Sequence, residues 1–166
     1  MKTKTKYILI FIIAVLAVSI DLITKYLFSD ISYTKIIPHI IAFQTNGGNS
    51  GAAFGLFSSN TAFLIIISII IITILLFIDS RLQITSKVYS IGLGLILAGG
   101  LGNFIDRIGL GYVRDFIMFD FWRSFPIFNF ADCCIVIGVV LVCVYLLFLS
   151  PKESSSSKQK GGQNGN

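Results

Sequence analysis

Four long apolar runs constrain this chain more than any other feature. They cover Tyr7–Phe28, Ala62–Ile78, Val88–Ile105 and Phe130–Leu149. A membrane-spanning helix needs about 20 predominantly apolar residues, and about 17 are tolerated. Lipid offers no partners to backbone N–H and C=O groups, so only helices and closed barrels can cross a membrane. Barrel strands would alternate apolar and polar residues, whereas these runs are continuous. The runs predict an all-α membrane protein with four transmembrane helices.

Composition supports the same class. Hydrophobic residues make up 55% of the 166 residues, charged residues only 13%, and the mean hydropathy is +0.87. A soluble globule of this size needs more polar surface. The first run also resembles a secretory signal peptide, because lysines precede it and Ala17-Val18-Ser19 could be a cleavage site. The apolar run continues to Phe28, which favours a retained helix.

Basic residues predict the orientation. Eight of them fall on the side that holds both termini and the loop at 79–87, and five fall on the other side. Both termini are therefore expected to be cytoplasmic. The net charge of +5 is explained by attraction to anionic membrane lipids, and no nucleic acid partner is expected.

The chain reads as one transmembrane domain over residues 1–151. A Ser-, Lys- and Gly-rich stretch at 152–166 is expected to be a disordered cytoplasmic tail. Two outer loops join the apolar runs. The first, Ser29–Asn60, is typical of short strands with a turn, or of a strand followed by an interfacial helix. The second, Arg107–Phe128, is rich in aromatic residues, which belong at the lipid headgroup level.

No metal or cofactor is predicted. Cys133, Cys134 and Cys143 all lie in the fourth run without metal-ligand spacing, so they are expected to fill space in the core. The single histidine, His39, has no second His or Cys near it in sequence.

The third run carries small residues every fourth position. Gly94, Ala98 and Gly102 form one stripe, which allows another helix to approach closely. Asp106 and Arg107 follow on the helix. They are expected either to hold the loop that presents Asp115 or to form a simple interfacial charge cluster.

Two aspartates suggest the chemistry. Asp115 lies in the second outer loop, and Asp132 lies at the start of the fourth run. Two carboxylates in a low-dielectric pocket cannot both ionise cheaply, so one keeps a proton. The ionised carboxylate can take a proton from water while the other protonates a scissile carbonyl. Structural alternatives remain: Asp132 as a helix N-cap, and Asp115 in a salt bridge with Arg114 or Arg107.

Other chemistries fit less well. The chain has no Gly-x-Ser-x-Gly elbow. Ser19 and Lys25 are six residues apart and on different helix faces, which disfavours a Ser–Lys dyad. A proton-coupled carrier would normally show internal repeats and mid-membrane polar residues, and a scaffold would not need acids clustered at one edge.

The polar residues fall into five ordered blocks. The blocks are Asp21-Leu22-Ile23-Thr24-Lys25, Asn49-Ser50-Gly51-Ala52-Ala53-Phe54, Gly99-Gly100-Leu101-Gly102-Asn103-Phe104-Ile105-Asp106-Arg107, Val113-Arg114-Asp115-Phe116 and Phe125-Pro126-Ile127-Phe128-Asn129-Phe130-Ala131-Asp132. In this order on four spans, they resemble the bacterial lipoprotein signal peptidase family (signal peptidase II), a family of four-span aspartyl proteases.

The resemblance implies a membrane aspartyl endopeptidase. Such an enzyme removes the signal peptide from a diacylglyceryl-prolipoprotein, cutting before the lipid-modified cysteine. It implies that Asp115 and Asp132 are catalytic. The substrate-binding or supporting positions that it implies are Asp21, Lys25, Asn49, Gly51, Asn103, Asp106, Arg107, Asn129 and Ala131. Asn49 and Arg107 would contact substrate or cyclic peptide inhibitors such as globomycin.

The resemblance also implies where the protein is located and which elements cover its active site. The protein would lie in the bacterial cytoplasmic (inner) membrane with its active site at the extracytoplasmic face. A small β-cradle and a mobile interfacial helix would cover the site. Asp106 would not be catalytic, because it is adjacent in sequence to Arg107, and Asn46 could compete with Asn49 for substrate.

Overall fold

The computed structural model describes residues 1–45 and 60–150. Within them, four helices are long and apolar enough to cross a membrane, which confirms the predicted spans. These helices are α1 (Thr3–Leu27), α2 (Thr61–Leu82), α3 (Lys87–Leu110) and α4 (Phe130–Val144), which continues as the π-helical turn η2 (Tyr145–Leu149). The first three continue beyond their apolar runs, because helical hydrogen bonding does not require apolar side chains. α3 ends only at Gly111, whose left-handed backbone (φ 81°) is a common helix terminator.

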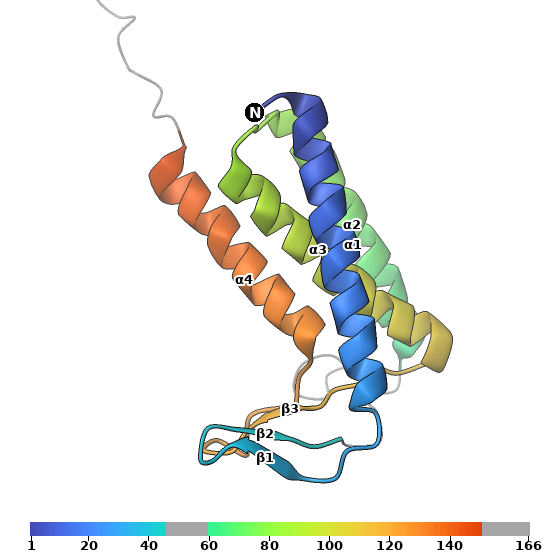
Figure 1. Ribbon diagram of the computed structural model, residues 1–166. Coiled ribbons are helices and arrows are strands. Elements are labelled where there is room, and N and C mark those ends of the chain that lie inside the picture. Colours follow the sequence, from blue (N-terminus) through green and yellow to red (C-terminus); the bar gives the residue numbers. More distant parts are fainter. Residues whose placement is uncertain (46–59, 151–166) are drawn as a thin grey trace, which may run out of the picture.

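A small sheet lies at one end of the helices (Figure 1). Its strands are β1 (Thr34–Ile37), β2 (Ile41–Phe43) and β3 (Ile117–Phe119), antiparallel and in the order β1-β2-β3. Both alternatives for the first outer loop begin with a strand, and short strands are found up to residue 45. The turn expected at 46–49 lies outside the described residues. The expected interfacial helix would fall within residues 46–59, outside the described residues. Because β2 pairs with β3, the sheet joins the two outer loops.

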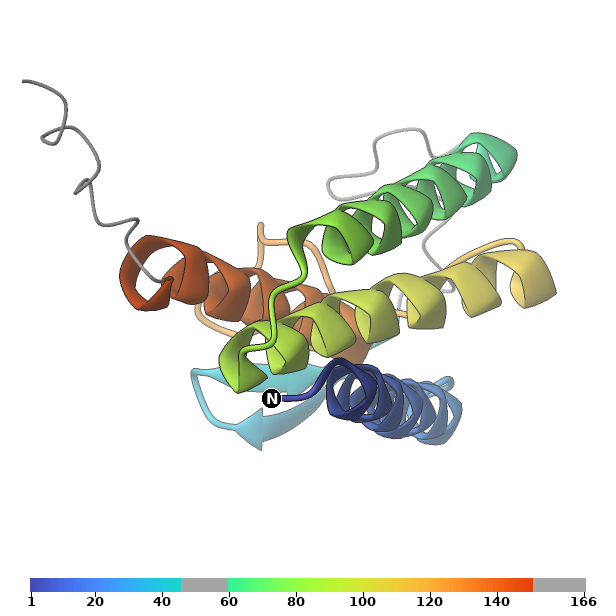
Figure 2. The ribbon, with the colours of Figure 1, turned by 90° about the horizontal axis from the view of Figure 1, so that it is seen from above.

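Helix α3 occupies the centre of the bundle. Viewed from above, it lies between α1, α2 and α4, and it packs against all three (Figure 2). Half of the most apolar stretch of α3 is buried, compared with 17% of the corresponding stretch in α1 and in the fourth span. The predicted stripe of small residues faces α1: Gly94 and Gly102 touch that helix, and Ala98 packs with Ala17 and Cys134. The stripe is therefore a helix-packing surface, and Cys134 fills core space as expected.

A second set of glycines brings α3 against α4. A β-carbon at Gly92 would lie 2.8 Å from the carbonyl oxygen of Gly138, and one at Gly99 would collide with the carbonyl oxygen of Ala131. Nothing in the residue spacing separates these glycines from the first stripe. Backbone contact of this kind is how helices associate in lipid, where hydrophobic burial provides little driving force.

Lys6 is buried in the protein and does not face the lipid headgroups. Lys6 is one of the eight basic residues on the side of the two termini, but its side chain is 1% exposed and its Nζ lies 2.6 Å from Oδ1 of Asp79. Its burial reflects the helix face, since Lys6 shares the buried stripe of α1 with Ile10 and Ala17. The pair joins α1 to α2 at the end of the bundle opposite the sheet (Figure 1).

The tip of the sheet is held by the carboxylate of Asp120. It accepts hydrogen bonds from the Tyr33 hydroxyl (2.6 Å), the Arg123 guanidinium (3.1 Å) and the backbone N–H of His39 (3.2 Å). His39 is a turn residue with a left-handed backbone (φ 63°). Asp120 thereby ties the β1–β2 hairpin to the segment after β3.

These contacts predict a pH window for the sheet tip. The Tyr33 hydrogen bond holds the pKa of Asp120 below its ordinary value, and the same bond raises the pKa of Tyr33. A lowered carboxyl pKa contributes stability that is lost as the pH falls through it, and a raised tyrosine pKa contributes stability that is lost as the pH rises through it. The bond should therefore persist throughout the neutral range.

The measurement is ultraviolet titration of tyrosinate in wild type and Asp120→Asn. One tyrosine should ionise at lower pH in the variant, because asparagine is uncharged. Asp30→Asn, which removes an exposed acid nearby in the outer region, is the matched control and should leave the titration unchanged. Identical curves for wild type and Asp120→Asn would show that this bond does not form in solution.

Candidate functional site

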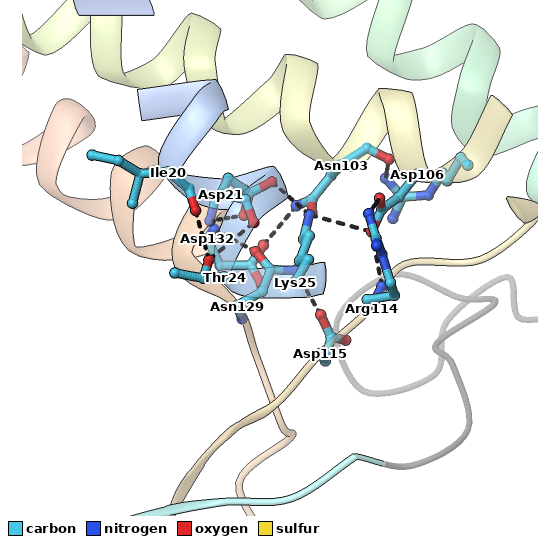
Figure 3. A network of polar contacts seen from close by, with 12 residues as sticks. Ile20, Asp21, Thr24, Lys25, Asn103, Asp106, Arg114, Asp115, Asn129 and Asp132 are labelled. Carbon is cyan, nitrogen blue, oxygen red and sulfur yellow. Dashed lines mark hydrogen bonds and ion pairs between the residues drawn. The ribbon is translucent and has the colours of Figure 1, made fainter. Parts of the chain in front are cut away.

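A network of polar side chains lies where α1, α3 and α4 approach the sheet (Figure 3). It contains Asp21 and Lys25 from α1, Asn103 and Asp106 from α3, Arg114 and Asp115 from the loop before β3, and Asn129 and Asp132 from the start of α4. The helices and loop thus bring together residues from four of the five sequence blocks. The fifth block contains Asn49 and Gly51, which lie outside the described residues.

Local capping positions Asp132. The Asn129 side-chain oxygen accepts a hydrogen bond from the backbone N–H of Asp132 (3.0 Å), and Asp132 Oδ2 accepts one from the backbone N–H of Asn129 (3.1 Å). This reciprocal capping box corrects one alternative: Asn129 is the N-cap of α4, and Asp132 is the third helical residue. The other oxygen, Oδ1, accepts a hydrogen bond from Asn103 Nδ2 (2.8 Å).

Asp115 reaches the same amide from the loop. Asn129 Nδ2 donates to Asp115 Oδ1 at 2.6 Å, and Asp115 is buried, with 8% of its surface exposed. The backbone beside it is fixed by the sheet region, because Phe116 N–H donates to the Phe128 carbonyl (3.0 Å). Asn129 therefore contacts both aspartates, which belong to separate segments.

Asp106 anchors the loop that carries Asp115. Its carboxylate accepts three hydrogen bonds from Arg114: from the backbone N–H (3.0 Å), from Nε (3.3 Å) and from the terminal guanidinium nitrogen (2.6 Å). Of the two expectations for Asp106, holding the loop is the one observed. Its hydrogen-bond partner Arg114 is not among the predicted site residues. Its position directly before Asp115 was the available signal.

Lys25 is the buried cation of the network. Its Nζ lies 2.8 Å from Asp21 Oδ2, 3.4 Å from Asp106 Oδ2 and 3.0 Å from Asn103 Oδ1, and its side chain is fully buried. The resemblance places Lys25 among the supporting positions of the site, and the structure brings it into the network. The remaining Asp21 oxygen accepts the backbone N–H of Ala131 (2.9 Å), so α1 is tied to the first turn of α4.

Arg107 lies beside the two aspartates. A terminal guanidinium nitrogen approaches the Asn103 carbonyl (3.5 Å), and the charge interacts electrostatically with Asp132 and Asp115. Positive charge here would favour an anion or a polarised carbonyl near the two carboxylates.

The four acids of the network have different partners. Asp21 contacts Lys25, and Asp106 contacts Lys25 and Arg114. Asp115 and Asp132 accept hydrogen bonds from the side-chain amides of Asn129 and Asn103, and the charge of Arg107 interacts with both. Amide donors orient a carboxylate while leaving it able to exchange a proton, which is what general acid–base chemistry requires. In residues 1–45 and 60–150, no three His, Cys, Asp or Glu side chains gather as a metal-binding group. The absence of a metal cofactor stays a prediction.

Comparisons with known proteins agree with one another. A family model described as signal peptidase (SPase) II matches residues 13–148. A lipoprotein signal peptidase from Enterococcus faecalis (strain ATCC 700802 / V583) is 37% identical over 158 residues, covering 93% of this chain and 95% of the relative. One from Staphylococcus aureus (strain JH9) is 38% identical over 154 residues, covering 90% and 91%.

Two solved structures share the fold. Both are described as a bacterial membrane enzyme structure obtained by the in meso method, one at 2.3 Å and one at 1.9 Å resolution. Each is 36% identical in sequence to this chain, with TM-scores of 0.77 and 0.75 respectively. The alignments cover 93% and 85% of this chain, and 94% of each solved chain.

Proposed function

Because the chain belongs to the signal peptidase II family of proteases, we propose that it removes signal peptides from diacylglyceryl-prolipoproteins. The proposed cut falls just before the lipid-modified cysteine. The observation that carries the proposed mechanism is that Asn129 donates to both carboxylates, to Asp115 through its side-chain amide and to Asp132 through its backbone N–H.

The two carboxylates would share one proton. The ionised carboxylate removes a proton from water as the water oxygen attacks the scissile carbonyl carbon, and the protonated carboxyl group donates to the carbonyl oxygen. Collapse of the tetrahedral intermediate then breaks the C–N bond, and the leaving amine takes up a proton from the pair. Arg107 is suited to stabilise the developing negative charge, because it interacts electrostatically with both carboxylates.

The position of the site fits a substrate that cannot leave the bilayer. The network lies at the sheet end of the helices, while the N-terminus lies at the opposite end (Figure 1). We place this sheet end at the extracytoplasmic face of a bacterial cytoplasmic membrane, with both termini cytoplasmic, from the excess of basic residues at the other end. Exposed Phe121 and Trp122 beside the sheet are suited to the headgroup level.

Asn49 and Arg107 are proposed to contact substrate or globomycin. Support for Arg107 comes from its place beside the carboxylates. Asn49 rests on the resemblance of its sequence block.

The test is cleavage of a synthetic diacylglyceryl-prolipoprotein by the purified protein in lipid, with the products identified by mass spectrometry. We expect a single cut before the modified cysteine, and inhibition by globomycin. The same peptide without diacylglycerol is the control and should remain intact. Equal cleavage of the two peptides would contradict a requirement for lipid, and intact lipidated peptide would contradict the proposed function.

Truncation after Pro151 should leave kcat/KM nearly unchanged. The reason is that the predicted catalytic domain ends there and the remaining residues offer no group suited to the chemistry. The same peptide assay on the shortened protein measures this, and a large loss of turnover would assign the tail a part in the reaction.

A further inference from the structure

We infer that Lys25 is a positioning residue that fixes the orientation of the amide holding Asp132 and supports the position of the amide holding Asp115. The inference rests on the proposed function for the reaction that it affects. Figure 3 shows Lys25 next to Asn103 and Asn129, between the two aspartates and the Asp106–Arg114 pair.

The first step concerns the amide of Asn103. An ammonium group has three donors and no acceptor, so the side-chain oxygen of an asparagine beside it must face it. Lys25 Nζ lies 3.0 Å from Asn103 Oδ1, and Asn103 Nδ2 lies 2.8 Å from Asp132 Oδ1. In the flipped amide, a donor would face the ammonium and an acceptor would face the carboxylate. Lys25 therefore determines that Asn103 presents an N–H group to Asp132.

The second step concerns the amide of Asn129. Its oxygen accepts the backbone N–H of Asp132 (3.0 Å), which is also a group that can only donate. Its Nδ2 then has two hydrogens to place, and it lies 3.0 Å from Asn103 Oδ1 and 2.6 Å from Asp115 Oδ1. One hydrogen goes to each. Asn103 Oδ1 thus accepts from both Lys25 and Asn129. By holding Asn103 Oδ1 in place, Lys25 supports the position of the Asn129 amide that donates to Asp115.

The third step is that Lys25 itself is held in place. It is fully buried between Asp21 (2.8 Å) and Asp106 (3.4 Å), and Asp106 is fixed in turn by Arg114. A donor held this firmly keeps the amides aligned before substrate arrives, so no reorganisation is needed at the moment of reaction.

The chain supplies a matched control in Lys6. Both lysines lie on the buried stripe of α1, both are at most 1% exposed, and each is ion-paired, Lys6 with Asp79. Lys6 lies in the first turn of α1, and Figure 1 shows that this end of the helix is opposite the sheet, whereas Lys25 lies in its last turn. Removing either charge leaves a buried carboxylate without its cation, so both variants should lose thermal stability. Only the loss of Lys25 should affect the amides.

The experiment is a double-mutant cycle on kcat in the lipidated-peptide assay, with thermal unfolding measured in parallel. Lys25→Met and Asn103→Ala should each lower kcat by about 10- to 100-fold, the loss typical when a group that orients a reacting residue is removed. The double variant should be no slower than Asn103→Ala alone, because Lys25 acts through Asn103.

Lys25→Arg, a donor-only cation, should regain most of the turnover. Lys6→Met should lose stability but keep kcat.

Two results would overturn the inference. One is a double variant whose kcat loss is the product of the two single losses. The other is a Lys25→Met variant that resembles Lys6→Met, with lower stability and unchanged kcat. If Lys25→Met does not accumulate, Lys25→Gln takes its place in the cycle and is read by the same two criteria. Wild-type turnover reports on the proposed function, and the ratios among variants report on Lys25, so the two can fail separately.

Discussion

Asp115→Asn and Asp132→Asn should each lower kcat on a diacylglyceryl-prolipoprotein by at least about 100- to 10,000-fold, the range for loss of a general acid or base. Asparagine has nearly the same shape as aspartate and keeps one acceptor oxygen. Asp132 accepts from the Asn129 backbone N–H through Oδ2 and from Asn103 Nδ2 through Oδ1, so asparagine at 132 can keep one of these two hydrogen bonds and places an N–H group opposite the other donor. What asparagine cannot do is take up or release a proton in the neutral range. The loss should appear in kcat more than in KM.

The measurement is single-turnover cleavage with purified variants, accompanied by thermal unfolding to show that the proteins are folded. Asp30→Asn is the control, since it removes an exposed acid from the outer region without touching the network. Undiminished cleavage by either catalytic variant would reject the two-aspartate mechanism.

Gly99→Ala, which adds a single methyl group, should abolish most of the activity. A β-carbon there would collide with the backbone carbonyl of Ala131 and lie 2.6 Å from the Ile135 side chain. A backbone carbonyl cannot rotate away, so α4 must move away from α3. Ala131 directly precedes Asp132, and a displacement of about 1 Å at a reacting group can lower the rate by about 100-fold. Overpacking of this kind also destabilises by about 1–3 kcal/mol.

The neighbouring glycine provides the comparison. A β-carbon at Gly100 would meet only the Ile72 side chain, at 3.6 Å, which is an ordinary contact. Alanine is favoured over glycine inside a helix by about 1 kcal/mol, so Gly100→Ala should be equally or more stable and fully active. Both variants are assayed for thermal unfolding and cleavage in the same lipid. Equal behaviour of the two variants would show that α3 and α4 do not meet as closely as described.

Local features of the chain were predictable. Apolar run length located all four spans, because lipid imposes one solution on the backbone. The predicted start of the fourth span at Phe130 is the start of α4, where Asn129 provides the cap. The resemblance selected the polar residues of the network, and the structure brings together those that it describes, including Asp21, Lys25 and Asn103.

Contacts between distant segments were not predictable in the same way. Strands of three and four residues pair across the two outer loops, Ala42 with Met118 for example, and nothing local to either loop specifies that register. The resemblance selects Lys25 for the site, but nothing local to α1 shows that Lys6 and Lys25 turn inward, because a buried cation depends on carboxylates that other segments or helix turns place beside it.

The sequence by itself determined that this chain crosses a membrane four times, where each helix lies along it, and which polar residues resemble those of the signal peptidase II family. Only the tertiary structure decided which partner each charge meets: Asp106 with Arg114, Lys25 and Asp132 with Asn103, and Asp115 with Asn129. The physical reason is the distance along the chain over which each interaction acts. Helix formation and membrane insertion depend on neighbouring residues, whereas an ion pair or hydrogen bond depends on where packing places side chains that are far apart in the chain.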